Sequence, residues 1–339
     1  MMLLDFNENP FDLPEEMKRE IMEAAMALPL NRYRSPLRDQ FVAELARYSS
    51  VDPEMIMFGN GADEIISIVI SACCGPNGRV IIPDPSFSGY PSLARMANTP
   101  VELVRSLTDF AFDVDQLQER VARGPAPNEA GRGATLVFLC RPNNPTGHLY
   151  PLADVERLCE VREDALVVVD EAYYEFAGST SHQLVDRYPN LLIMRTMSKA
   201  FSLAGVRLGY AFGQQPLVRR IDRTRPPFNT GVVSYAIGIE ALKRKDHFLT
   251  LVDTIKTWRE ELMAELAHIE GIRPFPSHTN FILIEVGPQA RQLQEDLLAK
   301  GIRIRHYGEF ASLENYLRIS IGTPEQNQAV LQGLRKALK

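Results

Sequence analysis

Short apolar runs that alternate with helical segments constrain the fold of this 339-residue chain more than any other feature. Runs such as LVFL at 136–139 and ALVVV at 165–169 are apolar at consecutive positions, which is typical of strands covered on both faces. Strands and helices in alternation predict an α/β domain with a mostly parallel central sheet flanked by helices. The predicted strands are 79–82, 101–105, 135–140, 165–169, 191–194 and 208–212, with helices at 91–97, 113–123 and 152–161.

The pattern changes near residue 228. A helical region at 232–269 leads to three strands (280–285, 303–306 and 316–321) and a final helix at 325–339, which predict a smaller α+β domain. A chain of this length is expected to form about two domains. We therefore expect an N-terminal arm and helix over 1–32 that pack with the small domain, a large domain over 33–228, and a small C-terminal domain over 229–339.

Charge and hydropathy exclude several kinds of partner. The net charge of −6 disfavours nucleic acid, which needs a basic surface. Apolar runs long enough to span a membrane and the features of a signal peptide are both missing, so we expect a cytoplasmic protein with no membrane partner. The four cysteines form no C-x-x-C pair and the six histidines are scattered, which predicts reduced thiols and no metal site.

Several common catalytic motifs are also absent from the sequence. It contains neither a G-x-x-x-x-G-K-[ST] phosphate loop nor a G-x-S-x-G elbow. The segment GNGADE at 59–64 lacks the third glycine of the dinucleotide fingerprint. These absences disfavour kinases, hydrolases and NAD-binding proteins.

A carboxylate and a lysine follow two of the predicted strands. Asp170 comes directly after ALVVV, at the edge of the sheet where α/β proteins bind ligands, although a lone Asp there more often caps a helix or holds a turn. Lys199 follows the strand LLIM and lies in RTMSKAF, among apolar residues that are unusual around a surface lysine. A desolvated lysine has a lowered pKa and can act as a Schiff-base nucleophile and as a base.

Phosphate-binding groups surround the same positions. Thr196, Ser198 and Arg207 bring two hydroxyls and a guanidinium close to Lys199 in sequence, and these groups can bind a phosphate. The backbone N–H groups of Ala62 and Asp63 begin a helix after a glycine turn, although such turns are common without any ligand. The heptapeptide RPNNPTG at 141–147 follows another strand, where Asn and Pro usually form a turn.

Together these motifs resemble the pyridoxal 5′-phosphate (PLP)-dependent aminotransferases of fold type I, and most closely the histidinol-phosphate branch of that family. They occur in the family's order and spacing across almost the whole chain. The matching stretches are NENPF at 7–11, NRY at 31–33, GNGADE at 59–64, NNPTG at 143–147, DEAY at 170–173, TMSKAF at 196–201, LAGVRLGY at 203–210, RPPFN at 225–229 and YLRISIGT at 316–323.

The resemblance implies a role for each residue near the cofactor ring. Lys199 would form the Schiff base with PLP, and Asp170 would pair with the pyridine nitrogen and keep it protonated. Tyr173 and Asn144 would hydrogen-bond the phenolic oxygen of the ring. Phe87 would stack on the ring, although packing in the core explains a phenylalanine at this position equally well.

The resemblance also implies how the cofactor phosphate is bound and how the chain assembles. Tyr33 would reach the phosphate from a neighbouring subunit, which implies a homodimer with shared active sites. The residues of the same chain that would bind the phosphate are Ala62, Asp63, Thr196, Ser198 and Arg207.

For the substrate, the resemblance implies amino-group exchange between L-glutamate and histidinol phosphate, by ping-pong kinetics. Arg318 would bind the carboxylate of glutamate, Arg305 the phosphate of histidinol phosphate, and Asn144 would also contact the substrate. Phe11 stands where many members have a tyrosine for the substrate phosphate, and it offers no hydroxyl. Three alternatives remain open: an aromatic-amino-acid aminotransferase, a threonine-phosphate decarboxylase, and a non-catalytic PLP-binding regulator.

Overall fold

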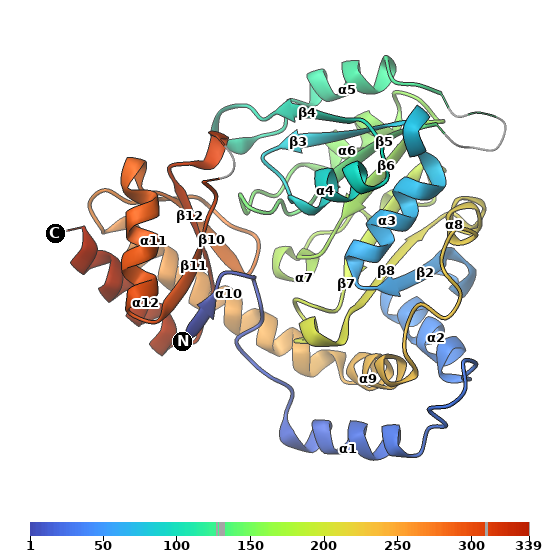
Figure 1. The fold of residues 1–339 in the computed structure, drawn as a ribbon, viewed down its shortest axis with the longest axis horizontal. Coiled ribbons are helices and arrows are strands. Elements are labelled where there is room, and N and C mark those ends of the chain that lie inside the picture. Colours follow the sequence, from blue (N-terminus) through green and yellow to red (C-terminus); the bar gives the residue numbers. More distant parts are fainter. Residues whose placement is uncertain (127, 129–132, 309–310, 339) are drawn as a thin grey trace.

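Two β-sheets organise the computed structural model, which describes residues 1–126, 128, 133–308 and 311–338 (Figure 1). The larger sheet has seven strands in the order β2-β8-β7-β6-β5-β3-β4. β8 runs antiparallel to both of its neighbours, and every other neighbouring pair in this sheet is parallel. The strands are β2 (Ile56–Asn60), β3 (Arg79–Asp84), β4 (Val101–Arg105), β5 (Thr135–Cys140), β6 (Leu166–Asp170), β7 (Leu191–Thr196) and β8 (Leu208–Gly213).

Helices cover both faces of the large sheet, and the buried side chains of its strands alternate between them. In β5, Leu136 and Phe138 belong to one hydrophobic cluster while Val137 and Leu139 belong to the other. This double burial explains why the strands are apolar at consecutive positions, and it confirms the predicted α/β class. One face packs against α3 (Ala62–Cys73), α4 (Gly89–Met96) and α8 (Gln215–Asp222), and the other against α2 (Leu37–Ser49), α5 (Val114–Ala122), α6 (Leu152–Cys159) and α7 (Tyr174–Ala177).

The smaller sheet joins the two ends of the described chain. Its order is β1-β11-β12-β10-β9, and β1 runs parallel to β11. Figure 1 shows β1 (blue) beside β11 (red), with α11 and α12 close by. We call the small sheet with α11 and α12 the small lobe, and the large sheet with the helices that cover it the large lobe. The bounds are β1 (Met2–Leu4), β9 (Arg273–Pro274), β10 (Phe281–Glu285), β11 (Ile302–His306), β12 (Tyr316–Ser320), α11 (Ala290–Ala299) and α12 (Pro324–Ala337).

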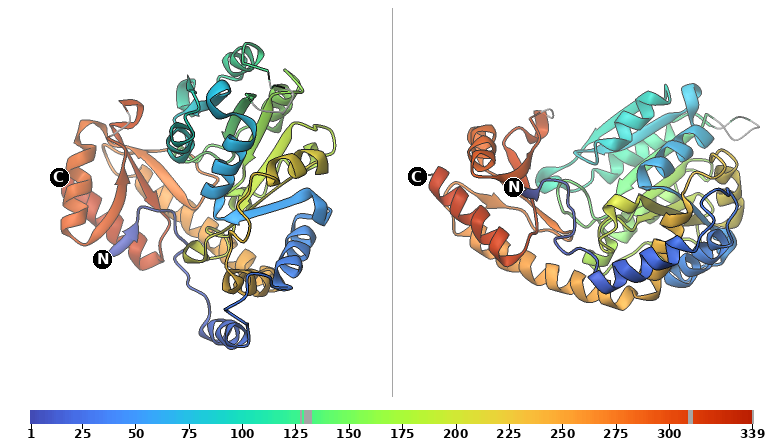
Figure 2. Two further views of the ribbon diagram at one scale, coloured as in Figure 1. Left: turned by 45° about the vertical axis from the view of Figure 1, so that its right-hand side comes forward. Right: turned by 60° about the horizontal axis from the view of Figure 1, so that its bottom comes forward.

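Three more helices lie along the lower edge of the molecule in the view of Figure 1, and one of them, α10, runs from the large sheet to the small sheet (Figures 1 and 2). The helical region predicted at 232–269 is two helices, α9 (Val232–Lys243) and α10 (Lys245–Ala267), because Arg244 leaves the helical conformation at φ −106° and ψ 26°. α10 contacts α7 in the large lobe and β9, β10 and α12 in the small lobe. α1 (Glu15–Met26) packs against α9. Within the described ranges, every helix is too short or too polar to pass through a lipid bilayer.

Candidate active site

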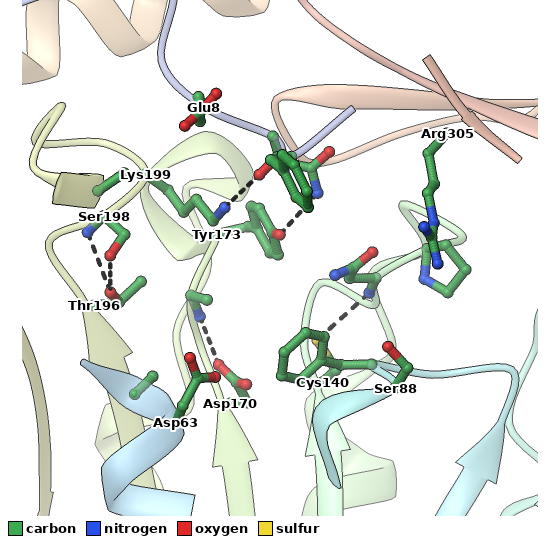
Figure 3. Close-up of a pocket in the computed structure, with 18 of the residues that line it drawn as sticks. Glu8, Asp63, Ser88, Cys140, Asp170, Tyr173, Thr196, Ser198, Lys199 and Arg305 are labelled. Atoms are coloured by element: carbon green, nitrogen blue, oxygen red, sulfur yellow. Dashed lines mark hydrogen bonds between the residues drawn. The ribbon is translucent and has the colours of Figure 1, made fainter. Parts of the chain in front are cut away.

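A pocket of about 520 Å³ lies where the carboxyl ends of β5, β6 and β7 face the small sheet. The start of α3 and residues 5–8 of the N-terminal arm complete its lining. Figure 3 shows Lys199 and Asp170 on the large-lobe side of this pocket and Arg305 reaching in from the small sheet. The position agrees with the ligand crevice expected at the carboxyl ends of strands in an α/β sheet.

Asp170, the last residue of β6, forms part of the pocket floor. Only 4% of its surface is exposed, and burial raises its pKa to about 6. One carboxylate oxygen accepts a hydrogen bond from the hydroxyl of Tyr90 at 2.6 Å, and the other accepts from the backbone N–H of Ala172 at 3.0 Å. The two donors fix the orientation of the carboxylate. Both donors are neutral, so a cation brought by a ligand would find a fixed carboxylate to pair with.

Lys199 follows β7 and extends its amine into the pocket. Nζ donates a hydrogen bond to the backbone carbonyl of Phe6 at 2.8 Å. Burial, followed by the nearby charge of Arg318, lowers the pKa of this amine to about 8. The lowered pKa increases the neutral fraction at physiological pH, and only the neutral amine can attack a carbonyl or accept a proton.

Tyr173 and Asn144 lie between these two groups and the small sheet. The hydroxyl of Tyr173 accepts a hydrogen bond from Nδ2 of Asn7 at 2.9 Å. Oδ1 of Asn144 accepts a hydrogen bond from the guanidinium of Arg318. The structure therefore brings the predicted ring-contacting residues together and connects them to the N-terminal arm and to β12.

The predicted phosphate-binding groups meet at the start of α3. Gly61 precedes the helix with φ +84°, and a side chain at this position would clash with the guanidinium of Arg207. Arg207 also pairs with Asp63 at 3.2 Å. Thr196 Oγ1 contacts the hydroxyl of Ser198 at 3.0 Å and its backbone nitrogen at 3.1 Å. These groups and the first N–H groups of α3 line one end of the pocket and form a site suited to an anion.

The opposite wall carries the two predicted substrate arginines. Arg305 and Arg318 are directly paired in the register of β11 and β12, and both line the pocket. Arg318 is only 5% exposed, and besides Asn144 it donates a hydrogen bond to the backbone carbonyl of Asp5. Its Nε has no hydrogen-bond partner among the described residues. A buried N–H without a partner is costly, so this wall favours an anionic ligand.

Of the three predicted aromatic site residues Phe87, Phe11 and Tyr33, only Phe87 lines the pocket. Phe87 lines the pocket and packs edge-on against Tyr90 at 5.3 Å between ring centroids. Phe11 differs from its predicted position, because its ring stacks on Trp258 of α10 at 5.3 Å and is not part of the pocket lining. Tyr33 is 84% exposed and stacks on Phe228, outside the pocket of its own chain.

Sequence reasoning missed three residues of the site: Asp5, Asn7 and Tyr90. Tyr90 lies near the start of α4, three residues after Phe87, which precedes the helix, and no helical spacing links the two side chains in the sequence. Asn7 belongs to the recognised NENPF stretch, but its contact with Tyr173 joins residues 166 positions apart. No pattern in the sequence around Asp5 indicates that this residue belongs to the site.

The lining fits PLP on structural grounds. The anion site at α3 suits a phosphate, Phe87 offers an aromatic face, and the buried carboxylate of Asp170 suits a protonated ring nitrogen. The amine of Lys199, with its lowered pKa, suits a bond to an aldehyde.

Comparison with known families decides the identity of the fold. The family model "Aminotransferase class I and II" matches residues 1–334. The chain belongs to this aminotransferase family. It is therefore a PLP-dependent aminotransferase, and the resemblance, fold class and cofactor predicted from the sequence are confirmed.

Three known aminotransferase-fold proteins illustrate the likeness. The histidinol-phosphate aminotransferase of Caldanaerobacter subterraneus subsp. tengcongensis is 36% identical over 335 residues, which cover 99% of this chain and 92% of that protein. The structure of the Sinorhizobium meliloti histidinol-phosphate aminotransferase, in complex with PLP, has a TM-score of 0.88 and 26% identity, covering 99% of this chain and 90% of the other. An L-threonine-O-3-phosphate decarboxylase from Porphyromonas gingivalis shares the fold with a TM-score of 0.82 at 22% identity, covering 100% and 99% of the two chains.

Proposed function

We propose that this aminotransferase exchanges an amino group between the pair L-glutamate/2-oxoglutarate and the pair histidinol phosphate/imidazole acetol phosphate, in histidine biosynthesis. The proposal depends chiefly on the paired arginines Arg305 and Arg318 in the wall opposite Asp170. Relatives that are 34–37% identical over nearly the whole chain carry the name histidinol-phosphate aminotransferase, which supports it.

The large-lobe residues would perform the chemistry common to both half-reactions. When bound, PLP supplies an electron-withdrawing ring that acidifies the α-proton of an amino acid. Asp170 would keep the ring nitrogen charged, and Tyr173 and Asn144 would orient the ring through its phenolic oxygen. Lys199 would anchor the cofactor and, once released, would move the proton at the substrate Cα, which its lowered pKa permits at neutral pH.

The two arginines would bind the anion of each substrate in turn. Arg318 would bind the carboxylate of glutamate, because a guanidinium binds a carboxylate or a phosphate through two parallel hydrogen bonds. Arg305 would join it for the phosphate of histidinol phosphate. A single pocket would then serve both substrates alternately, which predicts ping-pong kinetics.

We further propose a cytoplasmic homodimer in which Tyr33 reaches the cofactor phosphate of the partner subunit. The stacked pair Tyr33 and Phe228 supports this assembly, because both aromatic rings are more than half exposed in the single chain. Met22, Met26 and Leu30 add exposed apolar side chains to the preceding segment. We divide each subunit into an arm (1–32), a large domain (33–228) and a small domain (229–339).

The test is a comparison of amino donors with the PLP-loaded enzyme. The absorbance of the bound cofactor reports the first half-reaction, and kcat/KM is measured for histidinol phosphate, phenylalanine and tyrosine. We expect histidinol phosphate to exceed both aromatic amino acids by at least about 100-fold, because those donors carry no phosphate for Arg305. Comparable values would assign the chain to aromatic substrates. Release of carbon dioxide from threonine phosphate without an oxo acid would assign it to the decarboxylases.

A further inference from the structure

Three charged residues form a row across the small sheet, on the side that lines the pocket. Arg305 and Arg318 are direct partners on β11 and β12. β1 runs parallel to β11 with Leu4 beside Ile304, so the register, continued by one residue, brings Asp5 beside Arg305. Neighbouring residues in register point to the same face of a sheet, and all three line the pocket. We call Asp5, Arg305 and Arg318 the charged row.

Asp5 has an unusual environment for a carboxylate. Only 7% of its surface is exposed, and Oδ1 is buried without a hydrogen-bond partner among the described residues. Its backbone carbonyl, in contrast, accepts a hydrogen bond from Arg318, which holds the residue in place. A buried carboxylate oxygen is unfavourable without a donor, so the position suits a ligand that brings one.

The charged row therefore offers two unfilled positions of opposite character. Nε of Arg318 is a buried donor without an acceptor, and Oδ1 of Asp5 is a buried acceptor without a donor. A ligand that satisfies both must present an acceptor, most favourably an anion, to the arginine and a hydrogen-bond donor, such as an N–H group, to the carboxylate. Histidinol phosphate has both features, in its phosphate and its imidazole ring, whereas the side chain of phenylalanine has no N–H group.

We propose that Asp5 determines donor specificity: its carboxylate accepts a hydrogen bond from a side-chain N–H of the amino donor while Arg305 and Arg318 bind the donor's anion. This inference rests on the proposed function for its choice of substrate. It adds a residue of the N-terminal arm to the substrate site and predicts a preference for nitrogen-containing rings over purely hydrocarbon rings.

The experiment compares Asp5→Leu and Asp5→Asn with the wild-type holoenzyme. Leucine has a similar size but no acceptor, so kcat/KM for histidinol phosphate falls about 10- to 100-fold, mainly through KM. The value for phenylalanine stays the same or rises. Asparagine keeps one acceptor oxygen and restores part of the loss. An unchanged absorbance spectrum of the bound cofactor establishes that each variant is folded and loaded.

Asp12→Asn is the matched control, because it makes the same charge change in the same arm. Asp12 pairs with Lys18 and does not line the pocket, so its substitution leaves kcat/KM within about two-fold for every donor. Parallel losses for all donors in Asp5→Leu would overturn the inference, because a residue that only positions the arginines acts on every anion. No change for any donor would overturn it as well.

The outcomes separate this inference from the proposed function. If the wild type prefers histidinol phosphate but the Asp5 variants lower kcat/KM by the same factor for every donor, the proposed function stands and the role of Asp5 is wrong. The wild type could instead reject histidinol phosphate while Asp5→Leu lowers kcat/KM for histidine or tryptophan more than for phenylalanine. In that case Asp5 does recognise an N–H group, and the proposed substrate is wrong.

Discussion

The two walls of the pocket are built in opposite ways. The large-lobe wall takes Asp170 and Lys199 from positions next to the ends of adjacent parallel strands, in a sheet buried on both faces. The small-lobe wall joins Asp5 to Arg318, 313 positions apart, through a hydrogen bond that the Arg318 guanidinium donates to the backbone carbonyl of Asp5. The first wall holds the groups suited to the cofactor, and the second holds those suited to substrate anions. Arg318 nevertheless couples the two walls, because it contacts Asn144 and lowers the pKa of Lys199, so substitutions are needed to measure how far cofactor chemistry and substrate choice can be separated.

The largest expected effect tests the large-lobe wall. Lys199→Ala removes the amine that would anchor the cofactor and move the proton, so turnover falls by at least about 10³-fold. The absorbance characteristic of lysine-bound cofactor disappears as well. Lys199→Arg keeps a positive charge without a usable nucleophile and behaves in the same way. Retention of both the absorbance and turnover in Lys199→Ala would exclude this residue as the anchor.

Arg318→Leu tests whether the small-lobe wall can be disabled alone. The substitution removes a buried guanidinium, and kcat/KM for glutamate and for histidinol phosphate falls about 100-fold or more. The absorbance of lysine-bound cofactor persists because Lys199 is intact, but its pH dependence shifts, because Arg318 contacts Asn144 and lowers the pKa of Lys199. Arg318→Lys keeps the charge but loses the planar fork and recovers only part of the activity. A lost cofactor spectrum would show that the walls are not separable.

Tyr90→Phe sharpens the comparison within the large-lobe wall. It deletes the hydroxyl that lies 2.6 Å from Asp170, and this hydrogen bond lowers the pKa of that carboxylate against the effect of burial. The dissociation constant for PLP, measured by absorbance titration, rises about 10-fold. Tyr150→Phe is the control: Tyr150 is equally buried but donates to the carbonyl of Phe110, outside the pocket lining. An equal rise of the PLP dissociation constant in both variants would show that the hydroxyl of Tyr90 has no specific role in cofactor binding.

The smallest effect concerns stability rather than activity. Burial raises the pKa of Glu175 on α7 to about 8, from an ordinary value of 4.5. The folded state therefore holds a proton that the unfolded state releases, so this stabilisation is complete below pH 4.5 and is lost as the pH rises through 8. Glu175→Gln removes that loss, worth at most roughly 3–4 kcal/mol between pH 5 and 8. Denaturant titration at pH 5 and pH 8 measures the free energy of unfolding of the wild type and of Glu175→Gln. An equally steep decrease of that free energy with pH in the variant would refute the role of Glu175.

The difference between the walls also explains what the sequence could predict. Six strands of the large sheet and the positions of Asp170 and Lys199 followed from local patterns, because parallel strands bring their carboxyl ends to one edge. β2 was missed because IMFGN is short and includes a glycine, and β1 because three apolar residues form no pattern. The contacts of Asp5 and the stacking of Phe11 on Trp258 depend on distant segments that no local pattern encodes.

The pairing of β1 with β11 also has a consequence for biosynthesis. β1 leaves the ribosome about 300 residues before β11, which at typical translation rates is roughly 15 to 60 seconds. During that interval the large sheet can fold while the N-terminal arm has no strand to join. The wall that carries Arg305 and Arg318 is therefore the last part of the pocket to assemble on the nascent chain.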